Sequence, residues 1–190
     1  MAGFDEYLQS SLAVIEATRK SLDGARVEAA VAAAAAALMQ DKPLLVCGNG
    51  GSAADAMHVT AELVGRFLRE RRALKAICLA ANTAAITAWG NDYDYAGVFA
   101  RQVEAYGETG GVLLAISTSG NSPNVLEAAK AARAKAMTVV ALTGEGGGRL
   151  APLADILLAV PSRSTPLIQQ AHICIYHYIC AEIEARIAAS

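Results

Sequence analysis

The segment Val112-Leu113-Leu114-Ala115-Ile116-Ser117-Thr118-Ser119-Gly120-Asn121-Ser122-Pro123 is the clearest indication of how this chain folds. Its first part, 112–116, is a continuous apolar run, which is typical of a strand covered on both faces of a parallel sheet. The following residues are small and polar, and Gly120 lets the backbone turn tightly. Pro123 suits the first position of a helix, which we predict at 123–135. A strand, a polar loop and a helix in this order indicate an α/β protein that binds a ligand at the loop.

The same order of apolar run and polar turn recurs along the chain. Working outward from 112–116, we predict four more strands, at 43–47, 76–80, 138–142 and 156–160. Helical stretches separate the strands, at 52–68, 83–89, 95–106 and 123–135, and a long last helix is predicted at 166–188. Strands that alternate with helices predict a doubly wound α/β fold, in which a five-stranded parallel sheet is flanked by helices.

The first 40 residues predict helices only. Apolar side chains recur at helical spacing from Tyr7 to Leu22, and 27–39 is a second, Ala-rich helix. No linker, repeat or low-complexity tract divides the chain. We therefore expect one domain over 1–190, with an N-terminal helical region at 1–40 and an α/β core and C-terminal helix at 41–190.

Composition excludes several classes of protein. The 190 residues carry a net charge of −2 without a basic stripe, so nothing favours nucleic acid as a partner. The N-terminus lacks the features of a signal peptide and no apolar run reaches transmembrane length, so we expect no membrane partner. Cys47, Cys78, Cys174 and Cys180 have no CxxC spacing and lie in apolar segments. We interpret them as buried, reduced thiols of a cytoplasmic protein.

Polar residues follow each predicted strand, where ligands bind in such folds. The hydroxyls of Ser117, Thr118, Ser119 and Ser122, with the N–H groups at the start of the next helix, predict a phosphate-binding loop. The alternative is that Ser122 only caps the helix, which is compatible with anion binding. The loop 48–52 is a second candidate. It is not GxGxxG, so a dinucleotide site is not expected.

Two helices carry candidate metal ligands. His58 and Glu62 are spaced i, i+4 and share a helix face, although a surface His–Glu pair is the commoner explanation of that spacing. On the last helix, Gln169 and His177 lie off the apolar stripe that runs from Ile168 to Ile183. His172 falls on this stripe, so we interpret it as a packed or interface histidine.

Other polar residues keep two interpretations each. Asp92 follows Asn91 in a predicted loop and serves either a turn or substrate contact. Trp89, just before that loop, is interpreted as core or interface packing. The charge run of Arg69, Arg71 and Arg72 predicts a solvated face, with a phosphate contact from a neighbouring subunit as the alternative.

Taken together, these motifs resemble the sugar isomerase (SIS) domain and, more closely, the sedoheptulose 7-phosphate isomerase (phosphoheptose isomerase) family. The resemblance runs from about residue 40 to 185. It departs from the family pattern at Gly111, Asp94 and Gln170, none of which is a motif position. The residues that carry it are Gly48-Asn49-Gly50-Gly51-Ser52-Ala53-Ala54-Asp55-Ala56-Met57-His58, Glu62, Gly90-Asn91-Asp92-Tyr93, 116–122, Ile168-Gln169, His172 and His177.

The resemblance implies a SIS, flavodoxin-like fold and conversion of sedoheptulose 7-phosphate to D-glycero-D-manno-heptose 7-phosphate for ADP-heptose and lipopolysaccharide or related glycans. It also implies a homotetramer with active sites between subunits and one zinc per subunit. The implied zinc ligands are His58, Glu62, Gln169 and His177. The implied substrate contacts are Asn49, Gly50, Gly51, Ser52, Asn91, Asp92, Ser117, Thr118, Ser119, Ser122 and Gln169.

Aldose–ketose isomerisation moves a proton between C1 and C2 through an enediol, and so needs a base and a proton donor. Glu62 is the candidate base and His177 its acid/base partner; alternatively both only hold zinc. A rival function is that of a non-catalytic SIS regulator, such as the tetrameric protein that binds the replication initiator DnaA. A pure binding module has no need for the four proposed zinc ligands together, which favours the enzyme. A SIS transcription factor needs a DNA-binding helix-turn-helix region, and we reject this alternative because residues 1–40 are acidic to neutral and Ala-rich.

Overall fold

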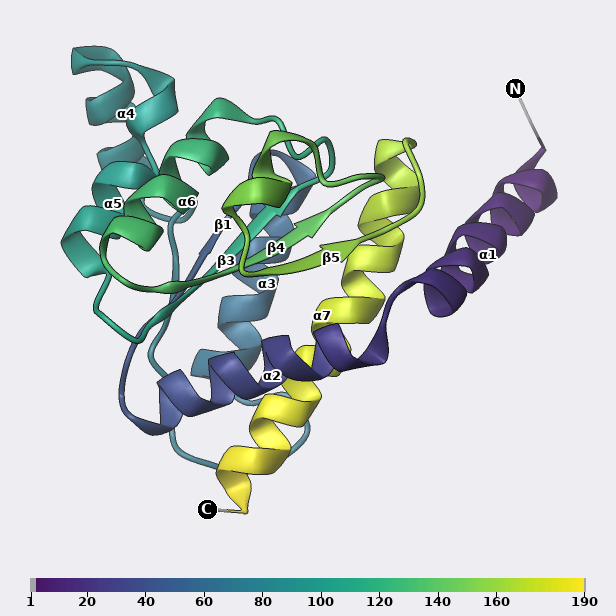
Figure 1. Cartoon of the computed structure of the whole chain (residues 1–190), viewed down its shortest axis with the longest axis horizontal. Coiled ribbons are helices and arrows are strands. Elements are labelled where there is room, and N and C mark those ends of the chain that lie inside the picture. The colour runs from purple at the N-terminus through teal and green to yellow at the C-terminus, as the bar shows by residue number, and fades with distance from the viewer. Residues whose placement is uncertain (1–2, 190) are drawn as a thin grey trace.

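The computed structural model describes residues 3–189, so the ends of the expected span 1–190 lie outside the described residues. At its centre is a sheet of five parallel strands in the order β2-β1-β3-β4-β5 (Figure 1). This confirms the predicted doubly wound sheet. The strands are β1 (Leu44–Cys47), β2 (Ala76–Cys78), β3 (Val112–Ser117), β4 (Thr138–Thr143) and β5 (Ile156–Ala159).

The strand order creates a crevice at one edge of the sheet. β1 pairs with β2 on one side and with β3 on the other, Leu44 lying opposite both Ala76 and Val112. The chain leaves β1 in one direction to form β2 and later returns on the other side of β1 to form β3. The loops that follow β1 and β3 therefore diverge, and ligands of such sheets bind at this switch point.

Helices cover both faces of the sheet (Figure 1). Along β3, the side chain of Leu113 lies in one buried cluster and that of Leu114 in the other, because successive side chains of a strand point to opposite faces. This explains why the strands are apolar throughout. One cluster includes α2 (Gly24–Met39), α3 (Gly51–Val64) and α7 (Thr165–Ala188), and the other includes α5 (Ala100–Tyr106) and α6 (Pro123–Ala134).

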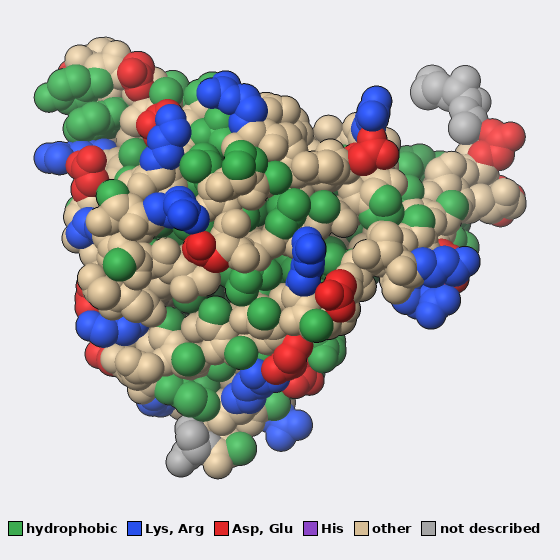
Figure 2. Space-filling model, viewed as in Figure 1, with side chains coloured by type: hydrophobic (Ala, Val, Ile, Leu, Met, Phe, Trp, Pro, Cys, Tyr) green, Lys and Arg blue, Asp and Glu red, His purple; other side chains and the backbone are tan. Residues whose placement is uncertain are grey.

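Helix α1 (Phe4–Ser21) stands apart from the sheet and reaches away from the body of the molecule (Figures 1 and 2). It exposes large apolar side chains, among them Phe4 at 78% and Leu12 at 66%. A groove of about 400 Å³ between α1, α2 and α7 is lined mainly by apolar residues. Among residues 3–189, no helix has the length and hydropathy needed to cross a membrane.

Several predicted boundaries are wrong. The Ala-rich helix predicted at 27–39 begins at Gly24, directly after the Asp23 cap, and the strand predicted at 76–80 ends at Cys78. The helix predicted at 52–68 ends at Val64, because the chain turns at Gly65 and the N–H groups that follow bond to a side chain of α7. The helix predicted at 83–89 is α4 (Thr83–Asp92), so Asn91 and Asp92 are helical rather than in a loop. The helix predicted at 95–106 is interrupted, with a 3-10 turn, η1 (Tyr95–Gly97), before α5. A second 3-10 segment, η2 (Gly148–Leu153), was not predicted.

The side chain of Arg71 is 1% exposed, so the prediction of a solvated face is wrong there. Its guanidinium donates to the backbone oxygens of Glu62 and Gly65 at 2.7 and 2.6 Å, at the C-terminal end of α3. It also lies 3.4 Å from the fully buried carboxylate of Glu184 on α7. A buried guanidinium is stable only beside an opposite charge. Here that charge comes from Glu184, which is too distant in the sequence for the run around Arg71 to indicate it.

The cysteine prediction is confirmed in part. All four thiols are free, and Cys47 and Cys180 are buried as expected. Cys174 is exposed, because it lies on the side of α7 that faces the groove rather than the sheet.

Candidate active site

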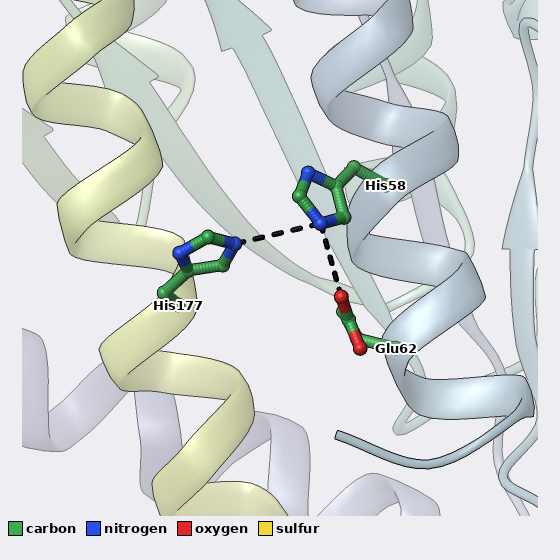
Figure 3. A group of neighbouring side chains, drawn as sticks. All are labelled: His58, Glu62 and His177. Atoms are coloured by element: carbon green, nitrogen blue, oxygen red, sulfur yellow. Dashed lines mark hydrogen bonds and ion pairs between the residues drawn. The ribbon is translucent and has the colours of Figure 1, made fainter. Parts of the chain in front are cut away.

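His58, Glu62 and His177 converge at one point between α3 and α7 (Figure 3). The distance from His58 Nε2 to Glu62 Oε1 is 3.0 Å, and that from His58 Nε2 to His177 Nε2 is 3.5 Å. One ligand atom from each residue lies within 4.8 Å of the others. The spacing i, i+4 places His58 and Glu62 on one face of α3, and the packing of α7 beside α3 supplies His177.

The hydrogen bonds around His58 define which ring nitrogen faces the cluster. The hydroxyl of Tyr176 lies 3.0 Å from His58 Nδ1 and donates to Asp55 Oδ1 at 3.4 Å. The Tyr176 hydroxyl therefore lies between Asp55 and Nδ1 of His58 and holds the imidazole ring in place. Nε2 is the ring nitrogen that faces Glu62 and His177, so it is the atom that His58 could offer to a metal.

Burial shifts the pKa values of Asp55 and Tyr176, the two residues that bond to each other behind His58. It raises the pKa of Asp55, although the Tyr176 hydroxyl and His58 oppose the shift. It also raises the pKa of Tyr176, which the negative charge of Asp55 reinforces, so the phenol stays protonated. Among the described residues, nothing bonds to the buried Oδ2 of Asp55.

His177 is held by an aromatic neighbour as well as by the cluster. The ring of Phe67 stacks on the His177 ring, with centroids 5.4 Å apart and an interplanar angle of 27°. Phe67 is positioned by its backbone N–H, which donates to Glu184 at 2.8 Å. His177 and Glu184 are seven residues apart, on the same face of α7.

The loop that follows β3 has the shape expected of an anion site. Ser117 is buried at the end of β3, and its hydroxyl lies 3.2 Å from that of Ser122. Ser122 occupies the N-cap position of α6, but its side chain makes no capping bond. Ser119 is exposed and Thr118 is partly exposed. The hydroxyl of Ser122 is thus directed to the loop and not spent on the helix.

Gly120 allows this loop to pack against the segment before η2. Its φ is +64°, and a Cβ there would lie 2.0 Å from the backbone oxygen of Gly147. The side chain of Asn121 links the same two segments, because Nδ2 donates to Ser119 O at 2.8 Å and Oδ1 accepts from Arg149 N at 3.1 Å. The loop is therefore fastened to the segment that leads into η2 by backbone packing and by the Asn121 side chain.

The second loop, after β1, leads directly into α3. Gly50 has a φ of +55°, and Ser52 is buried in the first turn of the helix. A Cβ on Gly51 would lie 2.4 Å from Nε2 of Gln169, so Gln169 packs against the start of α3. His58 lies two turns further along α3 than Gly51, at the level of His177 on α7.

Asn91 and Asp92 lie at the exposed C-terminal end of α4, where Asn91 Nδ2 donates to Asp92 Oδ1 at 2.9 Å. The segment that follows reaches the second loop, because the Tyr95 hydroxyl donates to Asn49 Oδ1 at 3.2 Å. Nearby, the Trp89 ring stacks on Tyr93 and packs against the core, in agreement with the packing role predicted for it.

His172 is a packed histidine, as predicted. It is fully buried, and its Nε2 lies 3.0 Å from the backbone oxygen of Thr143. Burial lowers the pKa of His172 to about 4, so the ring is neutral near pH 7. A buried neutral ring bonded to the sheet is part of the core.

Sequence reasoning missed the residues that support the cluster. Asp55 precedes His58 by three positions, and this spacing on one helix face was an available signal. Tyr176, Phe67 and Glu184 carried no such signal, because their partners are far away in the chain.

Known proteins resemble this chain closely. A SIS domain family profile matches residues 6–144. A phosphoheptose isomerase of Rhodospirillum rubrum is 52% identical over 149 residues, which are 78% of this chain and 79% of that protein. The solved structure of a phosphoheptose isomerase from Francisella tularensis superposes with a TM-score of 0.92 at 39% identity, covering 97% of this chain and 100% of that one. That of Neisseria gonorrhoeae gives a TM-score of 0.88 at 43% identity, over 94% and 96% of the chains.

Proposed function

The chain belongs to the phosphoheptose isomerase family of SIS-domain proteins, and on that premise we propose that it interconverts sedoheptulose 7-phosphate and D-glycero-D-manno-heptose 7-phosphate. It is a phosphosugar isomerase. The observation that carries the proposal is the cluster of His58, Glu62 and His177, in a chain that also has a preformed serine loop. A non-catalytic regulator is not favoured, since the relatives of this chain at about 50% sequence identity are phosphoheptose isomerases.

We propose zinc, one ion per subunit, as the cofactor. In a tetrahedral site with bonds of about 2.05 Å, ligand atoms lie about 3.3 Å apart. The separations of 3.0 and 3.5 Å at His58 Nε2 fit this value. Two imidazoles and a carboxylate are a common zinc donor set. Gln169 is the proposed fourth ligand, and it would have to extend from the start of α3 toward the cluster.

Catalysis is proposed to depend on two proton-transfer groups. Glu62 removes the proton from carbon and His177 delivers a proton at the neighbouring position. Bound zinc would polarise the carbonyl and stabilise the enediolate. A ligating carboxylate is a weaker base, so the alternative, that Glu62 and His177 only hold zinc, predicts a different outcome for the variants below.

Binding is proposed to involve both loops. The hydroxyls of the serine loop and the N-terminus of α6 bind the phosphate. The remaining substrate contacts belong to the second loop, to the end of α4 and to Gln169. The proposed binding residues are Ser117, Thr118, Ser119, Ser122, Asn49, Gly50, Gly51, Ser52, Asn91, Asp92 and Gln169.

We propose a homotetramer whose active sites lie at subunit interfaces. The exposed apolar side chains of α1 and the apolar groove beside it support self-association, because patches of this kind mark interfaces. Light scattering of the wild type and of Leu12→Glu tests this. A tetramer that persists unchanged in the variant would contradict a role of α1 in the interface.

We also propose that the whole chain is one SIS domain and acts in the cytoplasm, in heptose and ADP-heptose synthesis for lipopolysaccharide or related glycans. The four free thiols support a reducing compartment. The core clusters include α2 of the N-terminal helical region, which supports a single unit.

The deciding experiment is a coupled assay with sedoheptulose 7-phosphate, with and without a chelator. We expect turnover in the wild type that the chelator reduces and added zinc restores. Glu62→Gln and His177→Gln are then assayed at saturating zinc, where each should lose at least about 100-fold in kcat. Near wild-type turnover in both would contradict the catalytic roles.

Glu108→Gln is the matched control. Glu108 is a surface carboxylate paired with Lys42 and Lys75, and its variant should keep full activity. Calorimetry with zinc separates the two roles of Glu62 and His177. Variants that lose turnover but bind zinc normally would support proton transfer over ligation. Absence of product from the wild type with and without zinc would refute the isomerase proposal.

A further inference from the structure

Two asparagines that are 75 residues apart form a reciprocal amide pair. Nδ2 of Asn49 donates to Oδ1 of Asn124 at 2.8 Å, and Nδ2 of Asn124 donates to Oδ1 of Asn49 at 2.8 Å. Asn49 lies in the loop after β1 and is partly exposed, whereas Asn124 lies in the first turn of α6 and is 2% exposed. The pair therefore joins the two loops proposed to bind substrate.

The backbone of α6 fixes the orientation of both amides. The N–H of Val125 donates to Oδ1 of Asn124 at 3.0 Å. A backbone N–H only donates, so the Asn124 atom that faces it must be the oxygen, and a flipped amide would set two donors against each other. With Asn124 fixed, its Nδ2 faces Asn49, and the Asn49 atom that receives it must also be an oxygen.

This orientation determines what Asn49 offers to a ligand. Its Oδ1 accepts from Asn124 and also from the Tyr95 hydroxyl at 3.2 Å, so both lone pairs are in use. Its Nδ2 has two hydrogens and gives one to Asn124. One N–H is left at the partly exposed end of the side chain, and no acceptor is left.

We infer that Asn124 is a positioning residue, which fixes Asn49 as a hydrogen-bond donor to an acceptor oxygen of the phosphosugar. The inference rests on the proposed function for the identity of the ligand. It adds a residue that does not touch substrate and acts through Asn49. Without Asn124, only the exposed Tyr95 hydroxyl bonds to the Asn49 amide, which can then rotate and present its oxygen; that oxygen repels a phosphate or carbonyl oxygen.

A double-mutant cycle tests this mechanism by calorimetric Kd for sedoheptulose 7-phosphate. In Asn124→Ser, a short hydroxyl can still accept from Val125 N–H but cannot reach Asn49. We expect Asn124→Ser and Asn49→Ala each to weaken binding by roughly tenfold, the loss of one hydrogen bond to a charged or polar ligand. Because Asn124 acts through Asn49, the double variant should bind no more weakly than Asn49→Ala alone.

Gln102→Ala is the control for burial of an amide. Gln102 is 5% exposed and donates to backbone oxygens of Leu79 and Val98, away from the two loops. It should lower the melting temperature without changing the Kd, and Asn124→Ser should change both. If Asn124→Ser does not fold, Tyr95→Phe replaces it. Tyr95 is exposed, so loss of its hydroxyl should not prevent folding, and this hydroxyl also donates to Asn49 Oδ1. We expect a loss of about threefold that vanishes in the Asn49→Ala background.

Inorganic phosphate is the second probe and distinguishes the source of the acceptor oxygen. A parallel rise in its Kd assigns the N–H to the phosphate group, and an unchanged Kd assigns it to the sugar. Two results would overturn the inference. One is a Kd for sedoheptulose 7-phosphate that is unchanged in Asn124→Ser. The other is a double variant in which the fold-losses of Asn124→Ser and Asn49→Ala multiply. Wild-type protein that binds the phosphosugar without turnover would refute the isomerase proposal and leave the inference standing.

Discussion

Glu184→Gln should destabilise the protein far more than its conservative chemistry suggests. The Glu184 carboxylate is fully buried and accepts backbone N–H bonds from Phe67, Leu68 and Arg69 at 2.8, 2.6 and 2.7 Å. Its ion-pair partner, Arg71, is also buried. Glutamine removes the negative charge and turns an NH₂ group toward N–H donors. The variant therefore leaves a buried guanidinium without its carboxylate and at least one N–H without an acceptor.

The magnitude follows from these contacts. Removal of one partner from a buried ion pair costs about 3–5 kcal/mol of unfolding free energy. Loss of an acceptor for a buried N–H costs about 1–3 kcal/mol when taken alone, and the two effects overlap. We expect a total of about 4 kcal/mol. Glu108→Gln is the matched control, because Glu108 also pairs with two cations but its side chain is 39% exposed, and solvent screening should make its loss of stability much smaller.

Urea unfolding followed by circular dichroism measures both values. Protein concentration must be equal in all samples, because self-association makes apparent stability depend on concentration. A loss in Glu184→Gln no larger than that in Glu108→Gln would refute the reasoning. If the proposed zinc site is correct, the variant should also raise the Kd for zinc, because Glu184 positions Phe67 against His177.

The pH dependence of this loss provides a further check. Burial opposes ionisation of Glu184, but the three N–H donors and Arg71 outweigh it and lower the pKa below its usual 4.5. The contribution of Glu184 to stability is then present above about pH 4.5 and is lost as the pH falls below it. The difference between wild type and Glu184→Gln should therefore narrow in acid. A constant difference from pH 7 to pH 3 would contradict an ionised Glu184.

Three more predictions concern the core, the phosphate loop and a helix start. The pKa of His172 is about 4 in the folded protein and about 6.5 in the unfolded chain. The unfolding free energy should therefore fall by about 3 kcal/mol between pH 6.5 and pH 4, because only the unfolded chain takes up a proton there. Urea unfolding of the wild type and of His172→Gln measures this, and the same dependence of unfolding free energy on pH in both proteins would refute it. Gly120→Ala should abolish binding of inorganic phosphate in calorimetry, whereas Gly110→Ala, also at positive φ but with open space around it, should bind normally and lose only about 1–2 kcal/mol. Asp23→Ala removes the side-chain cap of α2 and should cost about 1 kcal/mol in thermal unfolding without change in turnover.

The sheet was predictable because its central strands, β1, β3 and β4, are buried on both faces and its edge strands, β2 and β5, are apolar although only partly buried. Continuous apolar runs such as 112–116 identify strands of this kind, and the polar turns after them identify the ligand edge. Helix boundaries were less predictable where a distant residue decides them. The sequence 65–68 gives no sign that Glu184 will capture its N–H groups, and the helix predicted to continue to 68 stops at Val64.

The candidate site divides along the same line. His58 and Glu62 could be paired from their spacing, and His177 could be selected because it lies off the apolar stripe of its helix. The partners of Asn49 and His177 could not be predicted, because Asn124 and Phe67 meet them only through tertiary packing. Chain-distant polar pairs leave no periodic signal in a sequence.

The position of both ligand loops beside the switch point of the sheet has a consequence for how the protein could be redesigned. Strands β1 and β3 are neighbours and Cys47 lies opposite Ala115, so the sheet fixes where each loop begins whatever the loops contain. Residues beyond the ends of the strands take no part in the ladder of backbone hydrogen bonds. Libraries that vary Thr118 and Ser119, and that spare Gly51, Gly120 and the amide pair, should therefore yield folded proteins with altered sugar preference. Substrate range could change here without loss of the fold, because the strands that set the spacing are separate from the residues proposed to bind the sugar.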